Sequence, residues 1–193
     1  AFFLCAGAMS REGIAVDGLS LPTRQGDSAL LPLLRQMGAV VNLSSGCITV
    51  RKGRLRATDI DARPIPDLIP PLSVLAAASE GESHIQNARR LRYKESDRLQ
   101  GIAELLNSLG GCLTVDGDGL LIHGVFHLQG GTVDPMGDHR LAMSAALAAL
   151  SADAPVTVRD ADCVSKSYPA FWADFQSLKG EAPCPAPSET PSV

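Results

Sequence analysis

The 193-residue sequence has few aromatic side chains, which make up 4% of it, so its core must consist mainly of aliphatic side chains. Its five cysteines are odd in number and scattered without a CxxC pair. Such spacing fits neither a zinc site nor a disulfide framework, so we expect reduced thiols and a cytoplasmic location.

Other classes of protein are excluded by what is missing. The net charge of −4 argues against general nucleic-acid binding, which requires a basic surface. No apolar run approaches the roughly 18 residues that span a bilayer, so no membrane insertion is expected. Neither a GxGxxG motif nor a Walker loop is present to indicate a nucleotide site.

An internal repeat organises the sequence. Three segments have apolar residues at helical spacing and end at a glycine, which is typical of a helix C-terminus. They are residues 27–38, 96–110 and 168–180, and their final glycines (Gly38, Gly110 and Gly180) are almost evenly spaced. Alanine-rich helices are predicted to start at Asp67 and Asp138. The separation of these two aspartates in the sequence is close to that between successive final glycines. Both kinds of helix therefore recur with one period of about 71 residues.

Short strands that can pair as hairpins follow the first two amphipathic helices. Residues 39–43 are predicted to pair with 47–51, and 112–115 with 120–123, across glycine-containing turns. One unit is therefore an α/β (α+β) segment of the form βαβαββ, and about 2.7 units fit in the chain (193 divided by 71). Because this period exceeds that of common solenoids, we expect the units to pack as one pseudo-symmetric domain over residues 1–180.

The two ends of the sequence deviate from the repeat. The predicted helix over residues 1–9 lacks the strand that would precede it, so we expect the domain to be truncated at its N-terminal edge. Residues 181–193 contain four prolines and no apolar period, which predicts a disordered tail.

Three basic residues stand where helix electrostatics disfavour them. The second amphipathic helix is predicted to begin near Lys94, with Arg98 close behind, and an alanine-rich helix begins near Arg140. A cation at a helix N-terminus costs a few tenths to about 1 kcal/mol, which Asp97 and Asp138 offset in part as capping residues. A bound carboxylate or phosphate would offset more, so the pattern indicates one anion-binding pocket. Ordinary surface charge is the alternative interpretation.

Five segments together resemble one enzyme family. Residues 94–99 (KESDRL) are similar to the KESDR or KETDR signature of 5-enolpyruvylshikimate-3-phosphate synthases, and residues 138–143 (DHRLAM) to their DHRMAM or DHRLAM segment. Residues 164–169, the pair at 66–67 and the QGD turn at 25–27 resemble further segments of these enzymes, in the same order. From position 1 to position 180 the chain is similar to the C-terminal half of this family. The resemblance implies the enolpyruvyl transferase fold, in which such units form one domain.

The resemblance also implies a reaction. It is transfer of the carboxyvinyl group of phosphoenolpyruvate to the 5-hydroxyl of shikimate 3-phosphate, with release of phosphate, in aromatic amino-acid biosynthesis. Asp67 would be the general base on that hydroxyl, and Glu95 would move a proton at the methylene carbon of phosphoenolpyruvate. The local alternatives are a helix cap for Asp67 and a first-turn acid for Glu95. Addition and elimination of this kind require no metal and no organic cofactor.

Five further residues would hold the substrates. The resemblance implies that Arg98 and Arg140 clamp the phosphoenolpyruvate carboxylate as bidentate forks. Lys94 and Lys166 would neutralise phosphate and hydroxyl oxygens. His139 would form a hydrogen bond near the leaving phosphate, although a lone histidine at a helix start is more often a cap or a solvent contact.

The chain departs from the family pattern in two respects. Arg90 stands four residues before Lys94, where the family often has an asparagine that contacts shikimate 3-phosphate. The family's N-terminal half is absent from the sequence, so we expect the chain to fold but to need that half as a partner for activity. Two alternatives are a UDP-N-acetylglucosamine enolpyruvyl transferase, which has similar repeats, and a non-catalytic anion-binding domain. The segments at 94–99 and 138–140 favour the shikimate enzyme, and the carboxylates of Asp67 and Glu95 argue against a mere binding domain.

Overall fold

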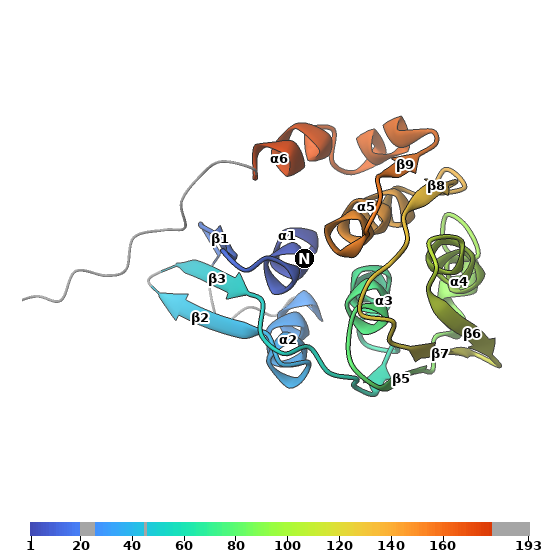
Figure 1. Ribbon diagram of the computed structural model, residues 1–193, viewed down its shortest axis with the longest axis horizontal. Helices are drawn as coiled ribbons and strands as arrows, with labels where there is room; N and C mark the ends of the chain where they lie inside the picture. Colours follow the sequence, from blue (N-terminus) through green and yellow to red (C-terminus); the bar gives the residue numbers. More distant parts are fainter. Residues whose placement is uncertain (20–25, 45, 179–193) are drawn as a thin grey trace, which may run out of the picture.

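The computed structural model describes residues 1–19, 26–44 and 46–178, in which three related units follow one another (Figure 1). Gln25, Gly180 and the predicted tail at 181–193 lie outside these ranges. Among the helices within them, none is long and apolar enough to cross a membrane.

The second unit is a complete βαβαββ segment, as the repeat predicts. Its elements are β4 (Ile60–Asp61), α3 (Ile69–Ala77), β5 (Glu82–Gln86), α4 (Arg98–Ser108), β6 (Cys112–Asp116) and β7 (Gly119–His123). The strands form one sheet in the order β4-β5-β7-β6, with β4 parallel to β5 and the other pairs antiparallel. The predicted hairpin is therefore present as β6 and β7, and Gly117 in its turn has a φ of 56°.

The first and third units repeat parts of this pattern. The first consists of α1 (Phe2–Met9), β1 (Ile14–Val16), α2 (Leu30–Gln36), β2 (Val40–Ser44) and β3 (Cys47–Arg51). The third consists of β8 (Gly131–Val133), α5 (His139–Ala148), β9 (Val156–Val158) and α6 (Phe171–Ser177). The sheet order β1-β3-β2 matches β5-β7-β6, and the parallel pair β8-β9 matches β4-β5. Ile60 lies opposite Ile85 and, one period further on, Gly131 lies opposite Val156, so the strand register repeats as well.

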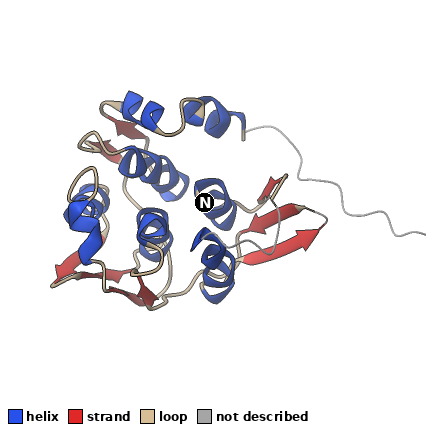
Figure 2. Cartoon of the chain, turned by 180° about the vertical axis from the view of Figure 1, so that it is seen from behind, coloured by secondary structure: helices blue, strands red, loops and turns tan. Residues whose placement is uncertain are grey.

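The alanine-rich helices α1, α3 and α5 form the centre of the molecule. They contact one another, while the sheets lie outside them (Figures 1 and 2). All nine residues of α3 are buried, as are nine of the ten in α5. A helix that is apolar on every side is stable only when other elements surround it, which explains this position. By contrast, α4 buries Leu99, Ile102, Leu105 and Leu106 on one face, as its predicted amphipathic pattern requires.

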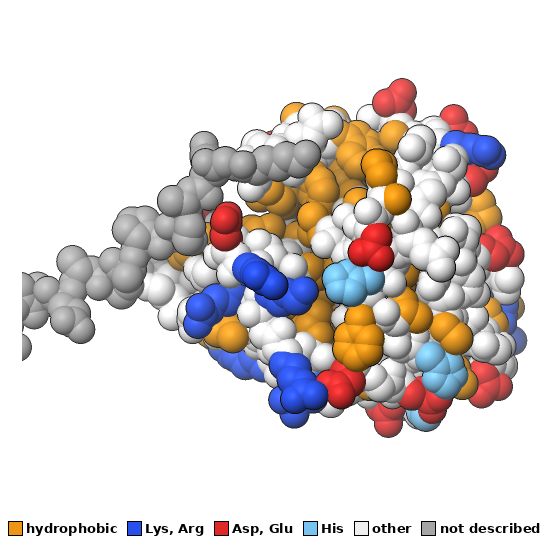
Figure 3. All heavy atoms as spheres, in the orientation of Figure 1, with side chains coloured by type: hydrophobic (Ala, Val, Ile, Leu, Met, Phe, Trp, Pro, Cys, Tyr) orange, Lys and Arg blue, Asp and Glu red, His pale blue; other side chains and the backbone are white. Residues whose placement is uncertain are grey.

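Most of the scarce aromatic residues gather where the first and third units meet. Neighbouring ring centroids there lie between 5.1 and 6.4 Å apart, which is typical of aromatic packing. The residues are Phe2, Phe3, Tyr168, Phe171, Trp172 and Phe175. This cluster joins α1 to α6. A groove of about 460 Å³ lies beside it, between α1, α5, β9 and α6, and Figure 3 shows hydrophobic side chains exposed beside α6.

Helix ends agree with the predicted caps, but some starts differ. Gly38 and Gly110 follow α2 and α4 with φ angles of 93° and 85°, which confirms both as helix-ending glycines. A Cβ at Gly38 would also lie 2.1 Å from the carbonyl oxygen of Arg54. The prediction that the second amphipathic helix begins near Lys94 is wrong by one turn. A 3₁₀ helix, η3 (Arg89–Tyr93), precedes Lys94, and α4 begins at Arg98 because Asp97 caps it by accepting a hydrogen bond from the N–H of Gln100 (3.1 Å).

Candidate active site

Three helix starts meet at one point on the molecule. Asp67 lies in η2 (Pro66–Leu68), immediately before α3, while Arg98 and Arg140 lie in the first turns of α4 and α5. The carboxylate of Asp67 is 2.9 Å from Nη1 of Arg98 and 3.1 Å from Nζ of Lys94. Nη2 of Arg140 lies 3.6 Å from the same carboxylate. The basic helix starts that the sequence placed in one pocket therefore do lie together.

Asp67 is held in its charged form. Partial burial raises the pKa of Asp67, but the charges of Arg140 and Lys94, with that of Arg98, outweigh this effect and keep the pKa below its ordinary value. Arg140 also donates from Nη1 to the backbone carbonyl of Asp67 at 3.1 Å, which fixes η2 against the start of α5. The Asp67 side chain is 38% exposed, so this carboxylate is both ionised and reachable.

Arg98 is the centre of the cluster and is almost completely buried. Its side chain is 1% exposed, so the alternative interpretation of ordinary surface charge is wrong for this residue. The guanidinium donates to Asp67 through Nη1, to Glu95 through Nη2 and to Asp138 through Nε at 2.7 Å. Every nitrogen of the guanidinium therefore has a carboxylate partner.

Asp138 is the buried counter-ion of Arg98. It caps α5 by accepting a hydrogen bond from the N–H of Arg140 at 2.9 Å, as predicted. It also accepts from Oγ of Ser96 at 3.0 Å. Burial raises the pKa of Asp138, but the hydrogen bonds from Arg98 and Arg140 hold it below its ordinary value. The sequence predicted the cap but not the ion pair. Its only signal for the pair was that an arginine and an aspartate stand at two successive basic helix starts.

His139 and Lys166 lie at the edge of the cluster. Nδ1 of His139 is 3.8 Å from Oε1 of Glu95, and burial lowers the pKa of His139, which favours the neutral imidazole. Lys166, at the end of η5 (Ala161–Lys166), donates from Nζ to the carbonyl of Gly137 at 3.0 Å, just before α5. Of the seven predicted site residues, six are joined by these contacts, and Lys166 approaches only the loop beside them.

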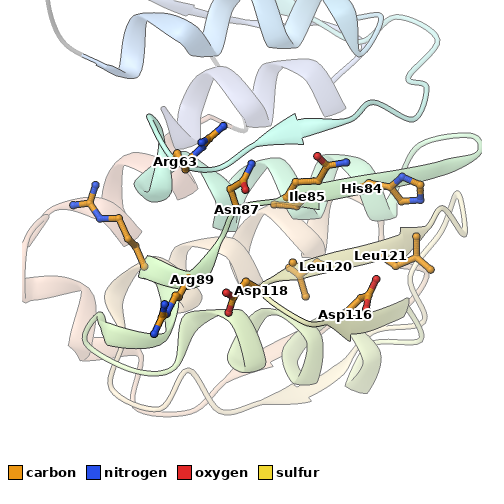
Figure 4. Close-up of a pocket in the computed structure, with 12 residues that line it drawn as sticks. Arg63, His84, Ile85, Asn87, Arg89, Asp116, Asp118, Leu120 and Leu121 are labelled. Carbon is orange, nitrogen blue, oxygen red and sulfur yellow. The ribbon is translucent and has the colours of Figure 1, made fainter.

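A separate pocket of about 620 Å³ lies next to η3 and the end of β5. Figure 4 shows Arg63 and Asn87 on one side of it and Arg89 and Asp118 on the other. Arg90 also lines this pocket, whereas none of the seven predicted site residues does. Among the described residues, no group of three or more His, Cys, Asp or Glu side chains is arranged to hold a metal ion.

Comparison with known proteins identifies the relatives of the chain. A family model described as EPSP synthase (3-phosphoshikimate 1-carboxyvinyltransferase) matches residues 1–175. The 3-phosphoshikimate 1-carboxyvinyltransferase of Clostridium kluyveri is 42% identical over 181 residues, which cover 94% of this chain and 42% of that protein. The protein of the same name from Methanocella arvoryzae is 46% identical over 177 residues, covering 91% of this chain and 42% of the relative.

The solved structures lead to the same group. The structure of EPSP synthase from Acinetobacter baumannii superimposes with a TM-score of 0.78 at 28% identity, over 94% of this chain and 45% of that one. This likeness confirms the predicted α/β fold of the enolpyruvyl transferase type. The chain thus spans less than half the length of these relatives. From the match over residues 1–175 and the fold, the chain belongs to the EPSP synthase family, as its sequence motifs predicted.

Proposed function

We propose that the full-length protein containing this chain transfers the carboxyvinyl group of phosphoenolpyruvate to the 5-hydroxyl of shikimate 3-phosphate and releases phosphate. This is the reaction of the shikimate pathway that leads to aromatic amino acids, carried out in the cytoplasm. One observation carries the proposal: two partly exposed carboxylates, Asp67 and Glu95, lie on either side of the guanidinium of Arg98. A site with carboxylates and cations interleaved in this way is suited to moving protons beside bound anions.

Each carboxylate has a step that its surroundings support. Asp67 takes the proton of the 5-hydroxyl as the hydroxyl oxygen bonds to the enol carbon of phosphoenolpyruvate. Glu95 gives a proton to the methylene carbon in the same step, which produces a tetrahedral ketal phosphate. The carbon–oxygen bond to phosphate then breaks, Asp67 returns the hydroxyl proton to the leaving phosphate, and Glu95 takes a proton back from the new methyl group. The ionised and reachable state of Asp67 supports its role as base.

The cations hold the substrates. Arg98 and Arg140 bind the carboxylate of phosphoenolpyruvate, while Lys94, Lys166 and His139 stabilise phosphate and hydroxyl oxygens. The guanidinium of Arg98 contacts protein carboxylates, so Asp67 and Glu95 must give up part of their contact when the substrate carboxylate arrives. The fixed pair with Asp138 would keep Arg98 in place during this exchange.

The test is phosphate release by the full-length protein in the presence of both substrates. Asp67→Asn and Glu95→Gln should each lower turnover by at least about 100-fold, the usual contribution of a positioned acid or base. Asp61→Asn, which removes an exposed pair with Arg63, is the matched control and should leave turnover unchanged. Wild-type rates in either active-site variant would leave a non-catalytic anion-binding role as the better assignment.

The 193-residue chain by itself should bind anions but not turn over. Its relatives are more than twice as long, and the two arginines need a second surface to enclose a substrate in a dry site. The assay is phosphate release from the two substrates by the isolated chain, compared with a blank without protein. Release above the blank would show that this chain contains the whole catalytic apparatus.

A UDP-N-acetylglucosamine enolpyruvyl transferase is the less favoured alternative. The family match and the curated relatives bear the name of the shikimate enzyme, and the segments at 94–99 and 138–140 agree with it. Competition between shikimate 3-phosphate and UDP-N-acetylglucosamine as acceptors for the full-length protein would distinguish the two.

A further inference from the structure

One buried side-chain nitrogen in the described residues has no hydrogen-bond partner, and it belongs to the candidate active site. It is Nδ1 of His139, on a side chain that is 9% exposed. Oε1 of Glu95 lies 3.8 Å from it, which is beyond hydrogen-bond length. A buried polar atom without a partner is costly, so such an atom beside a catalytic carboxylate requires a reason.

We propose that His139 is a positioning residue that keeps Glu95 in its acid form. The neutral imidazole carries its proton on Nε2, and Nδ1 accepts a hydrogen bond from the protonated carboxyl group of Glu95. A movement of about 1 Å by the Glu95 side chain would bring Oε1 within hydrogen-bond length of Nδ1. The inference rests on the proposed function, in which Glu95 donates a proton to the methylene carbon of phosphoenolpyruvate.

This hydrogen bond between Glu95 and His139 forms when the substrate binds. In the structure, Arg98 donates to Oε2 of Glu95. When a substrate carboxylate takes this guanidinium, Glu95 loses its partner and gains a negative neighbour. A carboxyl group next to another anion holds its proton more tightly. Nδ1 of His139 is then the acceptor beside the protonated oxygen.

Charged groups face the imidazole from several elements. Asp138 and Arg140 belong to its own helix, and Glu95 and Arg98 approach from the start of α4. Lys166 lies on η5, which also packs against α5. Its ammonium donates to the carbonyl of Gly137, in the loop before α5. The helices α1 and α3 contribute no charged residue. Burial lowers the pKa of the imidazole despite the two acids, which supports the neutral form that can accept a hydrogen bond.

The protons of the reaction remain balanced. During addition, the O–H bond of Glu95 breaks as a C–H bond forms at the methylene carbon. During elimination, a C–H bond of the new methyl group breaks and Glu95 regains its proton. The imidazole keeps its single proton on Nε2 in both steps, so no additional acid or base is needed.

Two substitutions of His139 in the full-length protein separate the hydrogen bond from the side-chain volume. In His139→Asn, the amide oxygen takes the place of Nδ1 as an acceptor, whereas His139→Leu has similar bulk and no acceptor. We expect the alkaline limb of the kcat–pH profile to lie roughly one pH unit lower in His139→Leu than in wild type. A shift of this size corresponds to one hydrogen bond that only the protonated carboxyl group makes. At about pH 8 its kcat should fall about tenfold, whereas loss of the imidazole's contact with phosphate oxygens affects the KM for phosphoenolpyruvate equally in both variants. His139→Asn should retain the wild-type limb.

A second measurement isolates the protonation step. Deuterium from D₂O should enter the methylene group of phosphoenolpyruvate more slowly in His139→Leu than in wild type or His139→Asn. Circular dichroism checks that the variants fold, and His139→Met replaces the leucine variant should that one fail to fold. A wild-type pH limb and exchange rate in the acceptor-free variant would overturn the proposal. A raised KM in both variants with an unmoved limb would also overturn it, by limiting the imidazole to its contact with phosphate oxygens. Absence of carboxyvinyl transfer in the wild-type protein would instead refute the proposed function.

Discussion

Replacing Asp138 with asparagine should destabilise the fold by about 3 kcal/mol, although the side chain keeps its shape. Asp138 is fully buried and accepts from Nε and Nη2 of Arg98 at 2.7 and 3.3 Å, from Ser96 at 3.0 Å and from the N–H of Arg140 at 2.9 Å. Asparagine retains one oxygen for the cap but turns N–H donors toward the guanidinium. Removing one partner of a buried ion pair costs about 3–5 kcal/mol because the other charge stays buried. The lower value applies here because two other carboxylates still pair with Arg98.

Urea unfolding of the chain, followed through the fluorescence of its single tryptophan, Trp172, measures this loss. Asp61→Asn is the matched control, since it removes the pair with Arg63, whose side chains are 45% and 70% exposed. An exposed pair contributes about 1 kcal/mol or less and is screened by salt. Added NaCl should therefore shrink the effect of Asp61→Asn and leave that of Asp138→Asn unchanged. If Asp138→Asn cost no more than the control, the reasoning that a buried ion pair joins the starts of α4 and α5 would be refuted.

Three further predictions concern pH, thiol reactivity and packing. The pKa of Asp138 is lower in the folded than in the unfolded chain, so its contribution to stability is complete above about pH 4 and is lost as the pH falls through the folded-state pKa. The free energy of unfolding measured down to about pH 2 should therefore fall less steeply in Asp138→Asn than in wild type. Burial raises the pKa of Cys5 to about 12, whereas Cys112 is exposed, so peptide mapping after alkylation at about pH 8 should find Cys112 modified and Cys5 protected until urea unfolds the chain. A Cβ at Gly7 would meet a backbone carbonyl of β3 at 2.5 Å, but at Gly101 it would meet only side-chain ends. Thermal unfolding should show Gly7→Ala destabilised by about 2 kcal/mol and Gly101→Ala changed by less than about 1 kcal/mol, despite equal gains in helix propensity.

The repeat and its element types could be predicted because their signals are local. The glycines that end α2 and α4 and the glycine turn between β6 and β7 each depend on a few neighbouring residues. Their regular spacing then predicted the βαβαββ unit. The start of α4 was misplaced because the acidic residues Glu95 and Asp97 resemble the first turn of a helix. The cap at Asp97 and the preceding η3 decide the boundary.

The candidate site could be predicted as a set of residues but not as a geometry. The motifs supplied Asp67, Glu95 and the arginines, since family resemblance carries over residue types at matching positions. The burial of Arg98 could not be predicted, because its partners Asp67 and Asp138 are 31 and 40 residues away in the sequence. Only the packing of α3, α4 and α5 brings these carboxylates to one guanidinium. Sequence periodicity gives no information on how deep a charged helix start lies.

The position of Arg98 within the repeat has a consequence for how such a centre arises. Asp67 and Asp138 occupy corresponding places in successive units, just before an inner helix, and Arg98 lies between them. Asp138 is fully buried and Asp67 is 38% exposed. The repeated aspartate is therefore a fixed counter-ion in one unit and a reachable carboxylate in the other. One repeat period before and after Arg98 stand Asp27 and Pro169, neither of which is an arginine. The internal repeat therefore places the same acid before two successive inner helices, and a single arginine without a counterpart in the other units pairs with both.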